Sequence, residues 1–210
     1  MPGDSFFLPY TDHFWSMEAD AQHRAAEFYL GRMLYKLCDR PESAVDFGCG
    51  TGQTLHSLKV QGTGFILGIE SETGLQKCRR LGVLDISDDE AFAFDLRNAS
   101  VFPKFSSEWT PDLVICIEVV EHLPEESALA LMRFLCRTGA KWIAFSGSSD
   151  WVHGTGHINC RPQEYWLEKM LQVGTHHLDR DRTDLLRSRL KSHVHVMKWL
   201  LNTMLFRRNE

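Results

Sequence analysis

The sequence predicts an α/β fold in which a mostly parallel sheet is covered by helices on both faces. Three observations predict it. Short apolar runs alternate with helical segments from residue 43 onward, which is the pattern of successive strand–helix–strand units. Glycine-rich and acidic motifs directly follow several of these runs, as expected where parallel strands end at one edge of a sheet. The length of 210 residues allows one sizeable core but not two comfortable domains.

The order of the elements follows from the hydrophobic pattern. A helix is predicted over residues 18–38, where apolar side chains recur every three or four residues until Pro41. Helices are also expected through 55–58 and over 72–81, 125–136, 162–173 and 184–199, and Gly174 closes the fourth of these. We expect a single domain over 41–210, with residues 1–40 forming an aromatic segment and a helix that cover the ligand site. Strands are predicted over residues 43–47, 64–70, 91–95, 112–117, 141–146, 176–181 and 204–207.

Composition excludes several classes of protein. The formal net charge of −5 gives no general attraction to nucleic acid or to anionic membranes. No apolar run approaches the roughly 20 residues that span a bilayer, and the first residues lack the pattern of a signal peptide. The six cysteines are scattered without zinc-site spacing, so we expect buried thiols in a reducing compartment. The sequence therefore predicts a cytoplasmic protein without a membrane partner, acting as a monomer or homodimer.

A glycine-rich turn follows the first predicted strand, in the stretch Val-Asp-Phe-Gly-Cys-Gly-Thr-Gly at residues 45–52. It lacks the Gly-Lys-Ser/Thr end of a P-loop, and Gln53 replaces the third glycine of the NAD fingerprint. The stretch resembles the first motif of class I S-adenosylmethionine-dependent methyltransferases. The resemblance implies a Rossmann-like three-layer sandwich with a seven-stranded sheet. It also implies that Asp46 holds the amino group of S-adenosylmethionine and that the backbone of Gly48, Cys49 and Gly50 lines its methionine part.

Acidic residues end the next two predicted strands. Glu70 is suited to accept hydrogen bonds from both ribose hydroxyls of a nucleoside, although a surface glutamate that begins a helix would fit the same position. The resemblance implies that Asp95 contacts the adenine amino group and that the Leu96 N–H contacts a ring nitrogen. The alternative for Asp95 is a helix cap. Ile117, at the end of the fourth predicted strand, is expected to contact the cofactor as well.

The stretch 111–124 resembles a motif shared by quinone-pathway, natural-product and sugar methyltransferases. Its Glu118, Glu121 and His122 stand at i, i+3 and i+4, which places them on one side of a helical turn. Two chemistries remain open. His122 or Glu118 acts as the base that deprotonates the acceptor, or the three side chains hold a divalent cation such as Mg²⁺, with His157 as the fourth ligand. Small-RNA 2′-O-methyltransferases resemble the second pattern. In a third reading, Glu121 and His122 only orient the loop.

Three further segments carry candidate residues. His157 lies in a glycine-containing loop after the fifth predicted strand and is expected either to face the acceptor as a base or hydrogen-bond donor or to fasten the loop. The loop and the following helix resemble those of bacterial small-molecule methyltransferases, and there we expect Tyr165 and Trp166 to anchor the core. Tyr10 and Trp15, in the aromatic first segment, are expected to contact the cofactor or to pack on the sheet.

Together these observations predict an S-adenosylmethionine-dependent methyltransferase that acts on a hydroxyl or amine of a small metabolite or sugar. Two other functions remain open: a metal-assisted RNA 2′-O-methyltransferase, and a regulator that binds the cofactor without catalysis. The basic residues between 180 and 208 fit a solvated helix face better than an RNA-binding surface, since no recognised RNA-binding module accompanies them.

Overall fold

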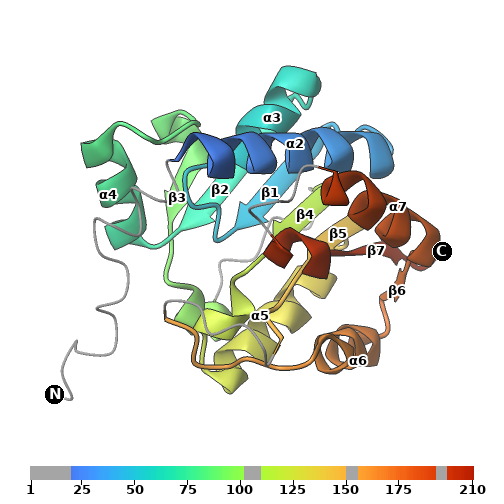
Figure 1. Cartoon of the computed structure of the whole chain (residues 1–210). Helices are drawn as coiled ribbons and strands as arrows, with labels where there is room; N and C mark the ends of the chain where they lie inside the picture. Colours follow the sequence, from blue (N-terminus) through green and yellow to red (C-terminus); the bar gives the residue numbers. More distant parts are fainter. Residues whose placement is uncertain (1–19, 102–109, 150–155, 193–197) are drawn as a thin grey trace, which may run out of the picture.

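The computed structural model of this chain describes residues 20–101, 110–149, 156–192 and 198–210. A seven-stranded sheet in the order β3-β2-β1-β4-β5-β7-β6 forms its middle layer (Figure 1). β1 to β5 pair in parallel, whereas β7 runs antiparallel to both of its neighbours. The predicted fold class is thereby confirmed. The strands are β1 (Ser43–Phe47), β2 (Phe65–Glu70), β3 (Ala91–Ala93), β4 (Leu113–Cys116), β5 (Trp142–Phe145), β6 (His176–Leu178) and β7 (Met204–Arg208).

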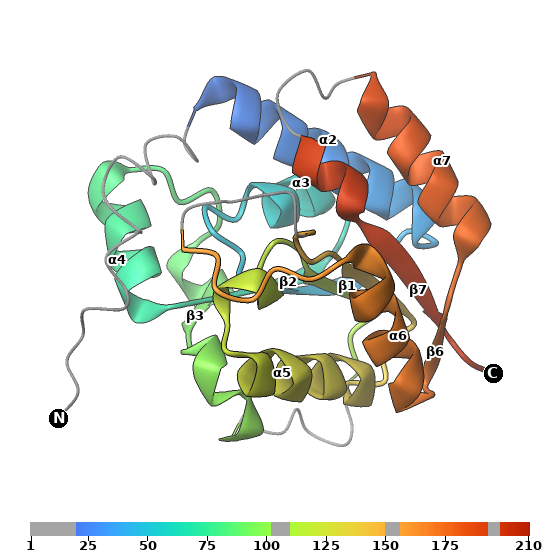
Figure 2. The same ribbon diagram turned by 60° about the horizontal axis from the view of Figure 1, so that its bottom comes forward.

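Helices cover both faces of the sheet (Figure 2). α2, α3 and α7 pack together on one face, and α5 and α6 pack together on the other. α4 lies beyond the β3 edge of the sheet (Figure 1). The described helices are α2 (Ala21–Leu37), α3 (Gln53–Gln61), α4 (Glu72–Leu81), α5 (Glu125–Arg137), α6 (Gln163–Val173) and α7 (Arg180–Lys191).

The apolar strands are buried on both sides because each strand contributes alternate side chains to two separate cores. On β4, Val114 and Cys116 join the core under α5 and α6, whereas Leu113 and Ile115 join the core under α2, α3 and α7. β5 divides in the same way. This double burial explains why these strands read as continuous apolar runs in the sequence.

The direction in which the chain moves across the sheet reverses at β1. After β1 the chain proceeds outward to β2 and β3, and it then returns to place β4 on the other side of β1. In open parallel sheets such a reversal leaves a crevice at the carboxyl ends of the strands, where ligands bind. The motifs that follow β1, β2, β3, β4 and β5 all lie at this edge.

Two predicted elements differ most from the structure, and the strand expected over 91–95 also ends early, at Ala93. The strand expected over 176–181 ends at Leu178, because the Asp179 side chain accepts a hydrogen bond from the Arg182 N–H and begins α7. The helix expected over 184–199 therefore starts at Arg180 and ends at Lys191. All six cysteines are free, and five are buried, as predicted. Among the helices of the described residues, none is long and apolar enough to cross a membrane.

Candidate active site

The turn after β1 leaves its backbone open to the crevice. Gly48, Gly50 and Gly52 all have positive φ angles, which glycine adopts without strain. A Cβ atom at Gly48 would lie 2.4 Å from Cγ2 of Val119, so the turn packs closely against the segment that follows β4. A Cβ atom at Gly50 would meet no atom within 4 Å. The turn is therefore packed on one side and accessible on the other, as a backbone that holds a ligand must be.

Two carboxylates flank this turn. Glu70 accepts hydrogen bonds from the backbone N–H groups of Gly50, at 3.2 Å, and Ser71, at 2.7 Å, so its side chain is directed at the turn. Asp46 is 5% exposed. Burial, and then the charge of Glu70, raise the pKa of Asp46 to about 7, and burial also raises the pKa of Glu70. A cationic ligand placed here would relieve the cost of keeping both groups ionised.

At the third strand end, the Asp95 side chain contacts a neighbouring arginine. The Asp95 carboxylate accepts hydrogen bonds from the Arg97 N–H, at 3.0 Å, and from the Arg97 guanidinium. Asp95 thus has the capping contact that was the alternative interpretation, while its side chain remains partly exposed. Leu96 is buried, and Ile117 is partly buried. Tyr10 and Trp15 lie outside the described residues.

Glu118 follows β4 in an unusual conformation. Its φ angle is +56°, in the left-handed region that residues other than glycine rarely adopt. Glu118, Glu121 and His122 therefore do not share one regular helical turn as the spacing predicted, because only Val120–His122 form a 3₁₀ turn. Burial raises the pKa of the Glu118 carboxyl, and hydrogen bonds with the Glu121 side chain and then with Ser146 partly oppose this rise.

The structure brings His157 to the side of His122, with ring centroids 4.6 Å apart. One ligand atom from each of Glu121, His122 and His157 lies within 4.8 Å of the others. Glu121 is 0% exposed, and its carboxyl group lies beside the Glu118 carboxyl group. Burial, and then the charge of Glu118, raise the pKa of Glu121 well above its usual range. A buried carboxylate of this kind is costly unless a cation or proton compensates it.

Backbone hydrogen bonds fix the position of His157. The N–H groups of Ile158 and Asn159 both donate to the carbonyl oxygen of Glu121, at 2.8 and 2.9 Å. Cys160 Sγ lies 3.5 Å from Nδ1 of His157. Burial, and then the neighbouring His157, lower the pKa of His122 to about 4. The lowered pKa means that the His122 imidazole is neutral at neutral pH, where it can act as a ligand or a base.

Ser146, Asn159 and Cys160 also belong to the site, although none of them was predicted as a site residue. All three contact predicted site residues or the backbone between them. Single serine, asparagine and cysteine residues carry no spacing pattern, so only their occurrence at a strand end or in the histidine loop could have indicated them. Trp166 is fully buried in the core, as predicted. The partly buried Tyr165 packs against the same core, while its hydroxyl donates to Glu125 on the surface.

A family model described as "Methyltransferase domain" matches residues 17–145, which is more than half of the chain. The chain belongs to this family of methyltransferase domains. The family expected from the glycine turn is thereby confirmed. The narrower likeness to sugar and small-molecule enzymes stays a prediction. No match was found among curated proteins.

Solved structures of methyltransferases share the fold of this methyltransferase domain. An O-methyltransferase family protein from Burkholderia thailandensis has a TM-score of 0.62 and 12% identity over 95% of this chain, which spans 59% of that protein. A SAM-dependent methyltransferase from Archaeoglobus fulgidus has a TM-score of 0.62 and 16% identity, with coverage of 93% of this chain and 99% of that one. The small RNA methyltransferase HEN1 has a TM-score of 0.56 and 17% identity, covering 85% of this chain and 25% of its own. At these identities the likeness shows the fold alone.

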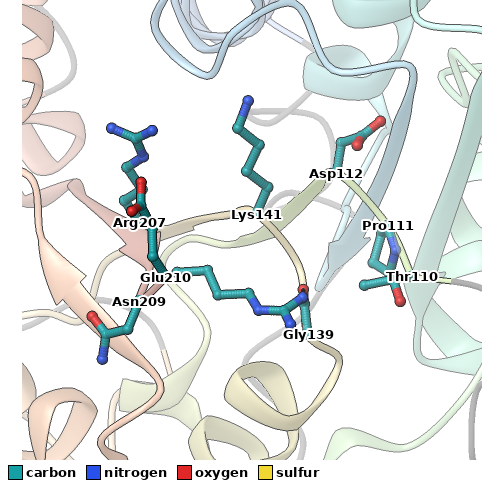
Figure 3. Close-up of a pocket in the computed structure, with 9 residues that line it drawn as sticks. Thr110, Pro111, Asp112, Gly139, Lys141, Arg207, Asn209 and Glu210 are labelled. Atoms are coloured by element: carbon teal, nitrogen blue, oxygen red, sulfur yellow. Dashed lines mark hydrogen bonds between the residues drawn. The ribbon is translucent and has the colours of Figure 1, made fainter.

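A separate hollow of about 360 Å³ lies away from this site, where the chain enters β4 and β5 (Figure 3). Asp112 and Lys141, which line it, directly precede these two strands. The hollow therefore lies at the opposite edge of the sheet from the glycine turn. Asp112 accepts hydrogen bonds from the backbone N–H groups of Glu42 and Ser43, and Lys141 pairs with Asp39 at 2.9 Å. These contacts join the loops that precede β1, β4 and β5.

Proposed function

We propose that this methyltransferase domain transfers the methyl group of S-adenosylmethionine to a hydroxyl group of a small metabolite or sugar. The observation that carries the proposal is the pair of buried carboxylates, Asp46 and Glu70, beside an open glycine turn. S-adenosylmethionine is cationic at its sulfonium and amino groups, and its ribose offers two hydroxyl donors. When bound, it supplies an already activated methyl group, so the protein contributes mainly orientation, exclusion of water and proton removal.

Each proposed cofactor contact has a place in this arrangement. Asp46 would hold the amino group. The Glu70 oxygens, which already accept from two backbone N–H groups, can accept further hydrogen bonds from the ribose hydroxyls. The backbone of Gly48, Cys49 and Gly50 would line the methionine part. The Leu96 backbone and Ile117 would border the adenine. Asp95 would reach the adenine amino group only by giving up part of its contact with Arg97.

We also propose that a divalent cation assists the reaction. The buried carboxylate of Glu121, with the imidazoles of His122 and His157, forms a donor set that fits a metal ion. Two imidazoles favour ions such as Mn²⁺, Co²⁺ or Zn²⁺ over Mg²⁺, which prefers oxygen ligands. The cation when bound would lower the pKa of the acceptor hydroxyl. Glu118 would face the acceptor and add a second negative charge near the cation. A hydroxyl acceptor gains from this assistance, whereas a neutral amine has no need of it.

A second candidate function is methylation of an RNA 2′-hydroxyl. The cluster of Glu121, His122 and His157 favours it, because a ribose hydroxyl is a weak acid that benefits from a nearby cation. HEN1, a small RNA methyltransferase, is among the proteins of similar fold. The net charge of −5 disfavours it. Binding of short RNA that weakens steeply with salt would support this candidate over a small acceptor.

The decisive experiment measures formation of S-adenosylhomocysteine with panels of sugars, nucleotide-sugars, phenols and short RNAs, each with Mn²⁺, with Mg²⁺ or with a chelator. We expect turnover with a hydroxyl-bearing small acceptor and at least about tenfold stimulation by Mn²⁺ over chelator. Turnover confined to RNA would replace the first candidate by the second. Cofactor binding without turnover on any acceptor would support a non-catalytic regulator instead.

The raised pKa of Asp46 predicts how cofactor affinity depends on pH. Asp46, with a pKa of about 7, is largely protonated at pH 6, and a bound amino cation favours the ionised form. Binding must therefore release a proton below pH 7, so the affinity should rise by up to about tenfold per pH unit toward pH 7 and then level off. Calorimetry in buffers of different ionisation enthalpy measures the released proton. Asp46→Asn should abolish this pH dependence, and an unchanged slope in that variant would refute the assignment.

A further inference from the structure

Ser146 contacts Glu118 at two points. It is the residue directly after β5, and it is 0% exposed. Its hydroxyl accepts a hydrogen bond from the Glu118 backbone N–H, with N and Oγ 3.0 Å apart, and donates one to Oε1 of the Glu118 carboxylate at 2.8 Å. One hydroxyl group therefore fixes both the main chain and the side chain of the same residue.

The sheet itself holds Ser146 in place. β4 and β5 pair in parallel up to Cys116 and Phe145, and the Ser146 N–H donates to the Cys116 carbonyl oxygen at 3.1 Å. The ladder thus continues one residue beyond the end of β5. Because this hydrogen bond fixes the Ser146 backbone, the Ser146 hydroxyl can hold the Glu118 carboxylate in one position.

Glu118 needs such a restraint because its backbone is strained. Within the described residues, Asp39, Arg40 and Glu118 are the non-glycine residues with positive φ angles, and the first two precede β1 at the opposite edge of the sheet. A left-handed conformation persists at a residue with a side chain only when its surroundings enforce it, and such residues cluster at active sites. This conformation sets the direction of the Glu118 N–H, which donates to the Ser146 hydroxyl.

We propose that Ser146 is a positioning residue that holds Glu118 in its strained conformation and directs its carboxylate into the acceptor site. The inference rests on the proposed function, in which Glu118 faces the acceptor. A side chain at position 146 must both accept from an N–H group and donate to a carboxylate. Threonine keeps this ability, whereas alanine lacks both groups.

The test compares Ser146→Ala with Ser146→Thr in two measurements. Hydrogen exchange of the Glu118 amide needs neither acceptor nor cation, and we expect at least about tenfold faster exchange in the alanine variant and near-normal exchange in the threonine variant. Steady-state kinetics should show kcat lowered about tenfold by alanine and restored by threonine, with the dissociation constant for S-adenosylmethionine unchanged. Undiminished protection of the amide in Ser146→Ala would overturn the proposal.

Ser57→Ala is the matched control for a merely structural effect. Ser57 is also 0% exposed, and its hydroxyl donates to the Phe28 carbonyl oxygen between two helices, away from the sheet edge. This variant should lower the unfolding midpoint without lowering kcat. If Ser57→Ala reduces kcat as much as Ser146→Ala does, the effect is one of general stability and the proposal is wrong.

A double-mutant cycle tests whether Ser146 acts through Glu118. In a Glu118→Ala background, Ser146→Ala should cost no further activity, since the carboxylate that it positions is absent. An equal loss in both backgrounds would overturn the proposal. Failure of the proposed function would give a different result from failure of the Ser146 proposal. The wild-type protein would then turn over no acceptor, while amide exchange at Glu118 would still decide whether Ser146 restrains it.

Discussion

Glu121→Gln is expected to lower kcat of methyl transfer by about 100-fold or more, while S-adenosylmethionine binding changes by less than about twofold. Glutamine preserves the size of the side chain but removes the charge that a cation beside His122 and His157 requires. The variant should also lose most of its affinity for Mn²⁺ alone. Calorimetric titration with Mn²⁺ and with the cofactor, together with initial-rate kinetics, measures these three quantities separately.

Glu125→Gln is the matched control for this variant. Glu125 begins α5, close in sequence to Glu121, but it is partly exposed and bonds to Arg161 and Tyr165 on the surface. Neutralising it should leave kcat and Mn²⁺ affinity within about twofold of wild type, since exposed ion pairs contribute little. Full activity of the Glu121→Gln variant would reject the proposed role of the cluster. Wild-type Mn²⁺ affinity in that variant would place the cation elsewhere.

Glu70→Ala is expected to weaken S-adenosylmethionine binding by at least about tenfold, which corresponds to about 1.4 kcal/mol. Alanine offers no acceptor for the ribose hydroxyls, and it also releases the Gly50 N–H that shapes the turn. Glu70→Gln should bind with intermediate affinity, because its amide oxygen still accepts. Calorimetry gives the affinities, and thermal unfolding without cofactor shows whether each variant remains folded.

Glu72→Ala serves as the control for Glu70→Ala. Glu72 lies two residues further on, in the first turn of α4, where its exposed carboxylate bonds to the Gln76 amide. Its loss should leave cofactor affinity unchanged. If the Glu70→Ala variant is folded and binds S-adenosylmethionine as tightly as wild type, the assignment of the ribose contact is wrong.

Much of the fold followed from patterns that are local in sequence. β1 was predicted at its observed bounds, as was α4, because β1 is a short buried strand that directly precedes the glycine turn and α4 lies between a Ser71 cap and Gly82. The region after residue 176 was less predictable. There Asp179 supplies a helix cap where the apolar pattern suggested that a strand continued, so a single side-chain hydrogen bond decided between the two.

The candidate site divides in the same way. Asp46, Gly48, Gly50 and Glu70 could be found from the sequence, because strand ends in a parallel sheet share one edge and the glycine turn is contiguous in the chain. The Asp95–Arg97 contact could not, since it depends on how a partly exposed arginine turns back on its neighbour.

The sequence by itself determined that a parallel sheet would place a glycine turn and two acids together at one edge. Tertiary structure alone decided three things: that His157 lies beside His122, that Glu121 is buried beside Glu118, and that Ser146 binds Glu118. The physical reason is that these contacts join the ends of different strands. Their geometry depends on strand pairing, on backbone hydrogen bonds from a distant loop and on one left-handed residue, and none of these leaves a periodic pattern in the chain.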